Sequence, residues 1–188
     1  NIKFLQINST NDINLLDLSI DKNEIGITYG FGVIFNKVII NKFKHGIWNI
    51  HPGDLPNYRG RHPISHAFLN NDFVIGVSIH IINHKIDRGK LICKDFVQRN
   101  IDDSPKDIEK KIFILLKSSL LKKSIKNFIS KKFTTLKKGK YYPSLINGIN
   151  IDNPKNYTAL YIFNAFRSQY DFSGVTIKNT QYMRCYFY

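Results

Sequence analysis

The sequence has little cysteine and no long hydrophobic run, and these two absences exclude several classes of protein. The two cysteines, Cys93 and Cys185, are too few for a disulfide framework or a zinc site and are typical of a reducing compartment. No apolar run reaches the about 18 residues that a membrane-spanning helix needs, and no basic-then-apolar leader opens the chain. We therefore expect a cytoplasmic protein with no metal site and no membrane partner.

Acidic residues are also scarce relative to basic ones. The chain has 14 Asp and Glu against 28 Lys and Arg, for a formal charge of +14, and much of the excess lies between residues 117 and 140. One interpretation is a polyanionic partner, either RNA or a phosphate-bearing small molecule. The other, which we favour, is that the lysines are spread over solvated faces.

Length and composition indicate one folded domain with a small appendage. The chain has 188 residues, of which 43% are hydrophobic, so a proper core can form and disorder is not indicated. Apolar runs at 24–29, 46–50, 73–82 and 90–97 predict strands, and the stretch 38–43 predicts a short helix between the first two. With the further short strand expected at 3–7 and helices at 13–20 and 63–69, these elements predict an α/β sheet.

The second half of the chain predicts a long helix and then a change of character. Ser104, Pro105 and Asp107 form a helix start, and apolar residues then recur at helical spacing to about residue 132. A linker is expected near residues 141–143. A helix at 157–167 and a hairpin made by 174–178 and 181–187 are expected to follow it.

One polar constellation organises the sequence. Asn49 and His51 are two residues apart at the end of a predicted strand, so both side chains point to the same face. Asp87 follows a second strand and sits in a turn that ends at Gly89. Each residue alone is often only a turn former, but an amide, an imidazole and a carboxylate delivered from separate strand ends form a recognisable catalytic arrangement.

The wider pattern resembles a known family. Asn-Ile-His-Pro-x-x-Leu-Pro-x-x-Arg-Gly, followed by Ile-Gly-Val-Ser-Ile-His and by Ile-Asp-x-Gly, resembles the folate-dependent formyltransferases over about residues 25–98. The resemblance implies a Rossmann-like α/β formyltransferase catalytic domain at residues 1–136, with its front part missing. It also implies a small α+β appendage at 137–188.

The resemblance implies formyl transfer from 10-formyltetrahydrofolate to an amine, without a metal. Asn49 and a protonated His51 would donate to the formyl oxygen, and Asp87 would keep His51 charged or receive the proton of the amine. The backbone and side chains expected to hold the pterin ring of the folate are Phe31, Gly32, Val33, His84 and Lys85.

Three further side chains lie near this pattern. Arg59 and Arg61 follow the catalytic histidine, and we expect them to contact the substrate, because a guanidinium suits phosphate oxygens. His80 is expected to be a buried histidine with its hydrogen bonds satisfied, either in the core or beside the site.

The function stays open among three alternatives, two of which differ in the amine acceptor. We favour an amino sugar linked to a nucleotide, because the chain is short and lacks the terminal barrel of the tRNA enzyme. The positive charge favours the methionyl-tRNA formyltransferases, which act on charged tRNA. The third alternative is a folate- or RNA-binding module without catalysis. Whether the chain forms a homodimer is left open.

Overall fold

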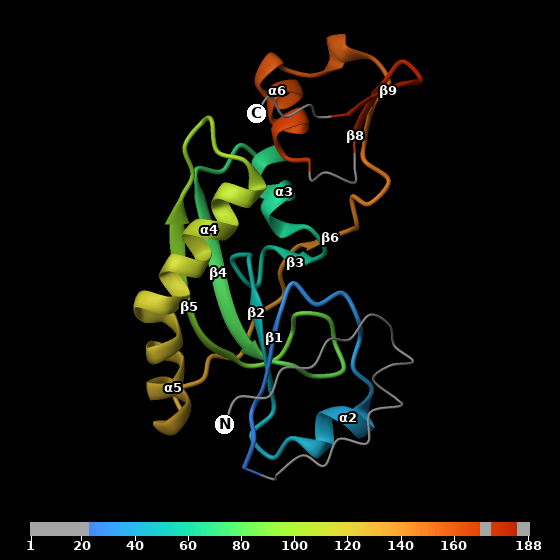
Figure 1. The fold of residues 1–188 in the computed structure, drawn as a ribbon. Coiled ribbons are helices and arrows are strands. Elements are labelled where there is room, and N and C mark those ends of the chain that lie inside the picture. The colour runs from blue at the N-terminus through green and yellow to red at the C-terminus, as the bar shows by residue number, and fades with distance from the viewer. Residues whose placement is uncertain (1–22, 170–173, 184–188) are drawn as a thin grey trace.

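The computed structural model describes residues 23–169 and 174–183 (Figure 1). The expected strand at 3–7, the expected helix at 13–20 and the last residues of the expected hairpin lie outside these ranges. No helix within the described ranges is both long and apolar enough to cross a membrane.

A four-stranded mixed sheet forms the centre of the fold, with its strands in the order β1-β2-β4-β5. Strand β1 pairs with β2 in parallel, whereas β2 with β4 and β4 with β5 are antiparallel. All four strands were expected from the sequence, and their bounds are Gly26–Tyr29, Ile47–His51, Val74–Ile81 and Leu91–Gln98.

The two faces of the sheet have different roles, because successive side chains on a strand point to opposite faces. On β2, Trp48 and Ile50 belong to the main hydrophobic core. Asn49 and His51 alternate with them and therefore lie on the opposite face. Alternation thus places Asn49 and His51 on the face of β2 that is turned away from the main core.

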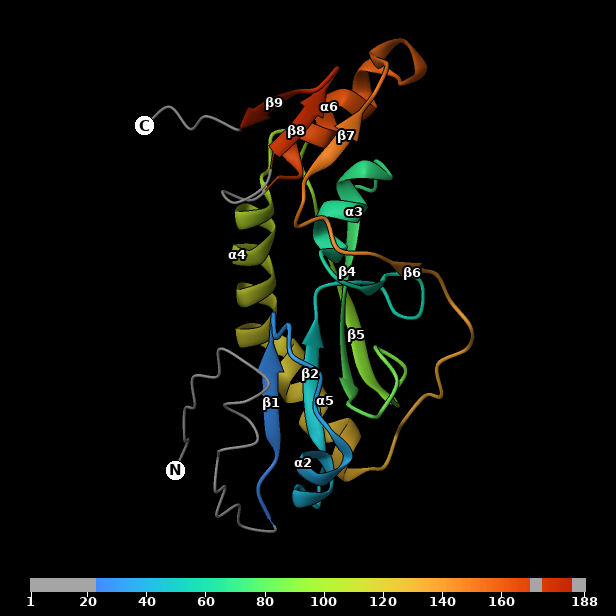
Figure 2. The ribbon, with the colours of Figure 1, turned by 90° about the vertical axis from the view of Figure 1, so that its right-hand side faces the viewer.

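A long helical segment covers the core face of the sheet (Figures 1 and 2). It consists of α4 (Pro105–Leu115), a single π-helical turn η1 (Leu116–Leu120) and α5 (Leu121–Ile129). The predicted start is confirmed: the Ser104 hydroxyl accepts a hydrogen bond from the Asp107 backbone N–H, and the Asp107 carboxylate accepts one from the Ser104 N–H. The π-helical turn was not predicted from the sequence.

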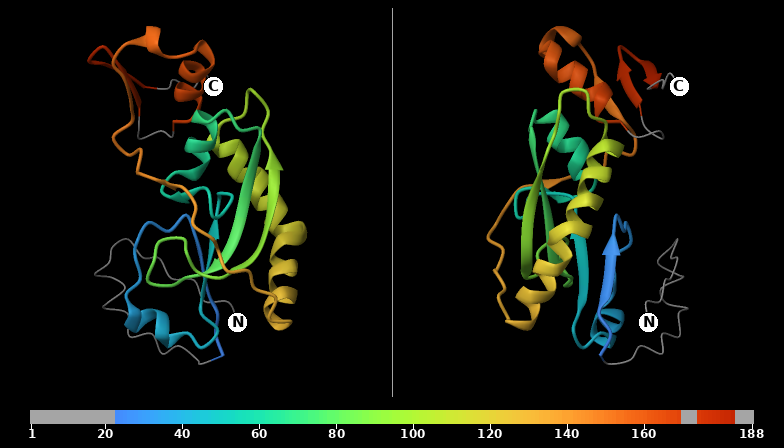
Figure 3. Two further views of the ribbon diagram at one scale, coloured as in Figure 1. Left: turned by 180° about the vertical axis from the view of Figure 1, so that it is seen from behind. Right: turned by 60° about the vertical axis from the view of Figure 1, so that its left-hand side comes forward.

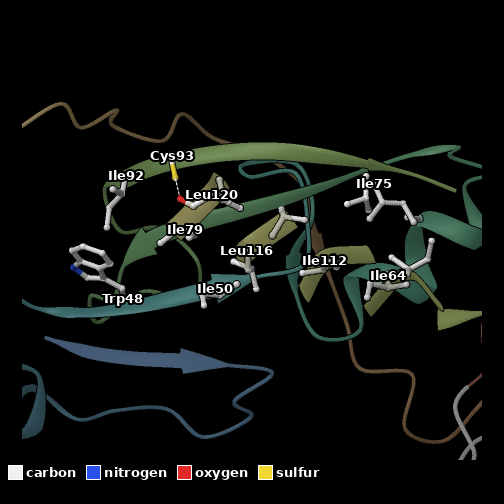
Figure 4. Packing of buried hydrophobic residues seen from close by; sticks show 14 of the residues in the cluster. Trp48, Ile50, Ile64, Ile75, Ile79, Ile92, Cys93, Ile112, Leu116 and Leu120 are labelled. Carbon is white, nitrogen blue, oxygen red and sulfur yellow. Dashed lines mark hydrogen bonds between the residues drawn. The ribbon is translucent and has the colours of Figure 1, made fainter. Parts of the chain in front are cut away.

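The core lies between this helical segment and the sheet and also includes Ile64, which belongs to the helix Pro63–Leu69 (Figure 4). Ile112 and Leu120 are 0% exposed, as is Ile79 on the facing strand β4. Burying each such side chain stabilises the fold by about 1.5–3 kcal/mol. The long helix is therefore fixed to the sheet by its apolar stripe.

Two shorter helices precede and follow β2 in the chain. Helix α2 (Lys37–Lys42) connects β1 to β2, and α3 (Pro63–Leu69) follows the proline-rich loop after β2. That loop contains the cis peptide bond Leu55-Pro56 and ends in the two-residue strand β3 (Arg59–Gly60).

The C-terminal part forms a separate small layer at one end of the sheet (Figure 2; Figure 3 shows it from behind). The chain returns from α5 along the side of the sheet through β6 (Tyr141–Tyr142), which pairs in parallel with β3. A three-stranded sheet of β7, β8 and β9 then packs with α6, which also contacts α3. Their bounds are Ile149–Ile151, Gly174–Ile177, Thr180–Met183 and Ala159–Arg167, with a short 3-10 turn η2 at Pro154–Asn156.

The helix and hairpin of this part were predicted, but β7 was not. The domain boundary expected between residues 136 and 137 stays a prediction. Strand β6 lies on the C-terminal side of that boundary yet pairs with β3, which lies on its N-terminal side.

Candidate active site

A cavity of about 430 Å³ opens on the polar face of β2. Asn49, His51 and Asp87 all line it, so the structure brings the three expected catalytic side chains to one space. Asn49 and His51 come from the end of β2, whereas Asp87 comes from the loop between β4 and β5.

His51 is almost fully buried and is held from two sides. Its exposed fraction is 4%, and its Nε2 donates a hydrogen bond to the main-chain oxygen of Tyr58 at 2.5 Å. Its Nδ1 lies 3.8 Å from Oδ1 of Asp87. The contact with Tyr58 places the proton of the neutral ring on Nε2 and leaves Nδ1 facing the carboxylate.

Asp87 is held in place by the backbone as well as by side chains. Its φ of 50° lies in the left-handed region, which Asp and Asn adopt more readily than most residues. Its Oδ2 accepts a hydrogen bond from the Gly60 N–H at 2.8 Å. Gly89 allows this turn, because a Cβ there would overlap the main-chain oxygen of Ile81.

His80 connects the amide to the carboxylate. It is paired in register with Asn49 on the neighbouring strand, so both side chains lie on the same face. Its Nε2 lies 3.3 Å from Nδ2 of Asn49 and 3.4 Å from Oδ1 of Asp87. The expectation that His80 is a buried, satisfied histidine agrees with this geometry.

The pKa values of His51 and Asp87 both lie below their usual values. Burial lowers the pKa of His51 and outweighs the opposing effects of Asp87 and the Tyr58 carbonyl, while His80 lowers it further. Burial would raise the pKa of Asp87, but the hydrogen bond with His80, the nearby His51 and the Gly60 amide together hold it below its usual range. At neutral pH Asp87 is therefore ionised and His51 is neutral.

The direction of the His51 pKa bears on one expectation. The sequence led us to expect that Asp87 keeps His51 charged in the free protein. The structure instead favours a neutral His51, because removing the imidazolium from water costs more than the carboxylate at 3.8 Å returns.

The segments expected to hold a pterin ring all reach the cavity. Phe31, Gly32 and Val33 line it from the loop after β1, and His84 and Lys85 line it from the loop after β4. The aromatic ring of Phe31 and the exposed backbone of Gly32 at this wall suit a flat heterocycle, so the residues present fit the folate group that the sequence pattern implies.

The two expected substrate arginines have different surroundings. Arg61 lines the cavity and donates from Nη2 to the Gly32 main-chain oxygen at 2.8 Å, which connects the loop after β1 to the loop after β2. Arg59 does not line the cavity. It is buried, and its Nη2 donates to the main-chain oxygen of Gly139 at 2.7 Å, a placement that argues against contact with the substrate.

Several site residues were missed in the sequence. The Thr28 hydroxyl donates to Oδ1 of Asn49 at 3.0 Å, and Glu109 and Tyr141 line the cavity from α4 and β6. Thr28 could have been found from its place at the end of a predicted strand. Tyr141 could not have been found in this way, because its position depends on the pairing of β6 with β3.

A second hollow, of about 730 Å³, lies between β5, α5 and residues 132–137. Its lining contains no His, Asp or Glu. It therefore lacks the acid and base groups that are present in the cavity beside β2.

Comparison with known proteins agrees with this geometry. Residues 10–122, more than half of the chain, match the sequence profile described as formyl transferase. The chain belongs to the formyl transferase family. Its fold is accordingly that of a formyltransferase catalytic domain, of which the chain covers a part.

Individual relatives differ in how much of this chain they cover and in how similar they are to it. A methionyl-tRNA formyltransferase from Borreliella burgdorferi is 39% identical over 112 residues, covering 58% of this chain and 36% of that protein. A solved 4-N formyltransferase from Francisella tularensis is 25% identical with a TM-score of 0.67, covering 94% of this chain and 74% of that one. The N-formyltransferase from Helicobacter canadensis, solved with folinic acid and dTDP-3-aminofucose, is 29% identical with a TM-score of 0.56, covering 73% of this chain and 52% of that one. The chain thus spans about a third of the length of the tRNA-enzyme relative.

Proposed function

We propose that this protein transfers a formyl group from 10-formyltetrahydrofolate to a primary amine, the amine being that of a nucleotide-linked amino sugar. The observation that carries the proposal is the convergence of Asn49, His51 and Asp87 on one cavity. The folate would supply the formyl carbon that the amine attacks, and it would be held by residues 31–33 and 84–85.

Each of the three side chains has a role that fits its surroundings. The Asn49 amide has two N–H donors, and the ring nitrogen of His80 at 3.3 Å can accept at most one of them, so at least one remains to stabilise negative charge on the formyl oxygen. Neutral His51 can accept the proton of the attacking amine at Nδ1, which faces Asp87. The ionised Asp87 then stabilises the imidazolium that forms.

Two observations support the nucleotide-sugar acceptor. The Helicobacter canadensis enzyme, which is 29% identical to this chain, was solved with folinic acid and dTDP-3-aminofucose, a dTDP-linked amino sugar. Arg61 at the cavity wall offers a guanidinium to a phosphate.

A charged tRNA is the second candidate acceptor, and the distribution of charge favours it. Residues 110–151 contain no Asp or Glu. The lysines of this stretch are Lys110, Lys111, Lys117, Lys122, Lys123, Lys126, Lys131, Lys132, Lys137, Lys138 and Lys140. The sequence relative that is 39% identical is a tRNA enzyme.

A panel assay tests both candidates. Nucleotide-linked amino sugars and charged tRNA would each be incubated with 10-formyltetrahydrofolate, and released tetrahydrofolate would be measured. We expect turnover with a nucleotide-linked amino sugar. If charged tRNA is the only acceptor that is turned over, and its binding weakens steeply with salt, the second candidate is selected. No turnover with any amine would refute formyl transfer.

A further inference from the structure

Two main-chain groups of the loop between β2 and α3 hold the catalytic pair. The Tyr58 oxygen accepts the hydrogen bond of His51 Nε2 at 2.5 Å, and the Gly60 N–H donates to Asp87 at 2.8 Å. No substitution of a side chain removes these groups directly. The positions of His51 and Asp87 therefore depend on whatever fixes residues 58–60.

The strand β6, which comes from the segment after the long helix, fixes this loop from outside. Arg59 donates from its backbone N–H to the Lys140 oxygen at 3.2 Å and from Nη2 to the Gly139 oxygen at 2.7 Å. A Cβ on Gly60, whose φ is 105°, would overlap the main-chain oxygen of Tyr142. The two backbones are thus in direct contact at the point where the loop reaches Asp87.

The side chain of Tyr142 adds a second, aromatic hold. Its ring stacks on that of Tyr58 with centroids 5.1 Å apart and planes 6° from parallel. The amide of Asn70 donates to both hydroxyls at 2.7 Å, and the Tyr58 hydroxyl also donates to Asp72. The ring of His66 lies 4.5 Å from that of Tyr142.

We propose that Tyr142 is a positioning residue: by stacking on Tyr58 it holds the carbonyl that fixes the His51 tautomer and the amide that orients Asp87. Tyr142 does not line the cavity, so it would contribute to the chemistry through Tyr58 and Gly60 and not through contact with the substrate. The catalytic consequence rests on the proposed function, whereas the state of the His51 ring does not.

The electrostatics of His51 give the direction of the effect. The Tyr58 carbonyl raises the pKa of His51 against the larger lowering by burial. The other titratable groups that act on this ring are Asp87, from the loop after β4, and His80, from β4. The remaining charged or titratable residues that line the cavity are Arg61, His62, His84, Lys85, Glu109, Tyr29 and Tyr141. A loosened Tyr58 carbonyl should therefore lower the pKa of His51 further.

The experiment follows the His51 ring by ¹⁵N NMR of histidine-labelled full chain, with the signal assigned by its loss in His51→Gln. In the wild type we expect a single Nε2–H tautomer. In Tyr142→Ala the chemical shifts of the two ring nitrogens should move toward each other, and the titration of the ring should move to lower pH. Tyr142→Phe, which keeps the stack, should restore both.

Controls separate positioning from folding. Tyr157→Ala truncates another stacked tyrosine, 4.9 Å from Tyr161 and remote from the loop, and it should leave His51 unchanged. If Tyr142→Ala does not fold, Tyr142→Leu keeps the apolar bulk and should give the same shifts. Unchanged His51 signals in a folded Tyr142→Ala or Tyr142→Leu variant would overturn the proposal.

Kinetics distinguish the two proposals. With an active acceptor, Tyr142→Ala should lower kcat about tenfold to a hundredfold with little change in KM, and Tyr142→Phe should recover most of it. A wild type without turnover but with the expected NMR behaviour refutes the proposed function and leaves the positioning role intact. Full kcat in Tyr142→Ala refutes the positioning role in catalysis.

Discussion

The substitution Asp87→Asn isolates the charge of Asp87 from its shape. Asn has nearly the same size, tolerates the left-handed backbone at this position, and retains an oxygen that can accept the Gly60 N–H. What it removes is the negative charge 3.8 Å from Nδ1 of His51. The variant therefore tests whether that charge stabilises a proton on His51 during transfer.

The magnitude follows from that distance. Two unit charges 3.8 Å apart interact by about 4 kcal/mol at an effective dielectric constant of about 20. If the whole interaction is gained only when His51 takes the proton, its loss slows the reaction by about a thousandfold. Reorientation of the new amide and entry of water return part of this energy, so we expect kcat to fall by about a hundredfold to a thousandfold.

The assay is the release of tetrahydrofolate with the acceptor found in the panel. Asp95→Asn is the matched control, because Asp95 pairs with Lys123 at 3.6 Å on another part of the sheet and should show wild-type kcat. A folded Asp87→Asn variant with less than a tenfold loss would refute the role of the charge. Such a result would leave Asp87 as a turn-forming residue.

Three further predictions concern the pH profile, a close contact and a helix start. The pKa of His51 lies below its ordinary value of 6.5, and the neutral ring is the base. We therefore expect kcat/KM to be flat near pH 7 and to fall only below pH 6.5. A fall in kcat/KM that already begins above pH 6.5 on acidification would contradict a neutral His51. Gly89→Ala should lower both Tm and activity, because the added Cβ overlaps the Ile81 carbonyl oxygen, and an unchanged Tm would show that the turn adapts. Ser104→Ala removes the helix cap and should lower the free energy of unfolding, measured by urea denaturation, by about 1 kcal/mol. Ser118→Ala, at an exposed position inside the helical segment, should change it little. Equal effects of the two substitutions would contradict the capping role.

Much of the fold could be predicted because its signals are local. The start at Ser104 and the apolar stripe of the long helix depend on residues three or four positions apart, and the strands depend on short apolar runs. The pattern around Asn49 and His51 is also local, because strand alternation alone places both on one face. Such features need no knowledge of what packs against them.

The remaining features depend on contacts between distant parts of the chain. No local pattern encodes a strand register or the path of the chain. The pairing of Asn49 with His80 requires the first, and the approach of β6 to residues 59–60 requires the second. The hydrogen bond from Arg59 to Gly139 depends on that path as well. Strand β7 was missed because its three residues give too short a pattern.

The sequence by itself determined the family resemblance, the four strands of the central sheet and the long helical segment, and it singled out Asn49, His51 and Asp87 as candidates for one site. Only the tertiary structure decided the protonation of the imidazole and what holds it. The reason is physical: the pKa of His51 is set by how completely water is excluded and by a carbonyl, a carboxylate and a second histidine from other segments, and both the burial and these contacts exist only once the chain has folded.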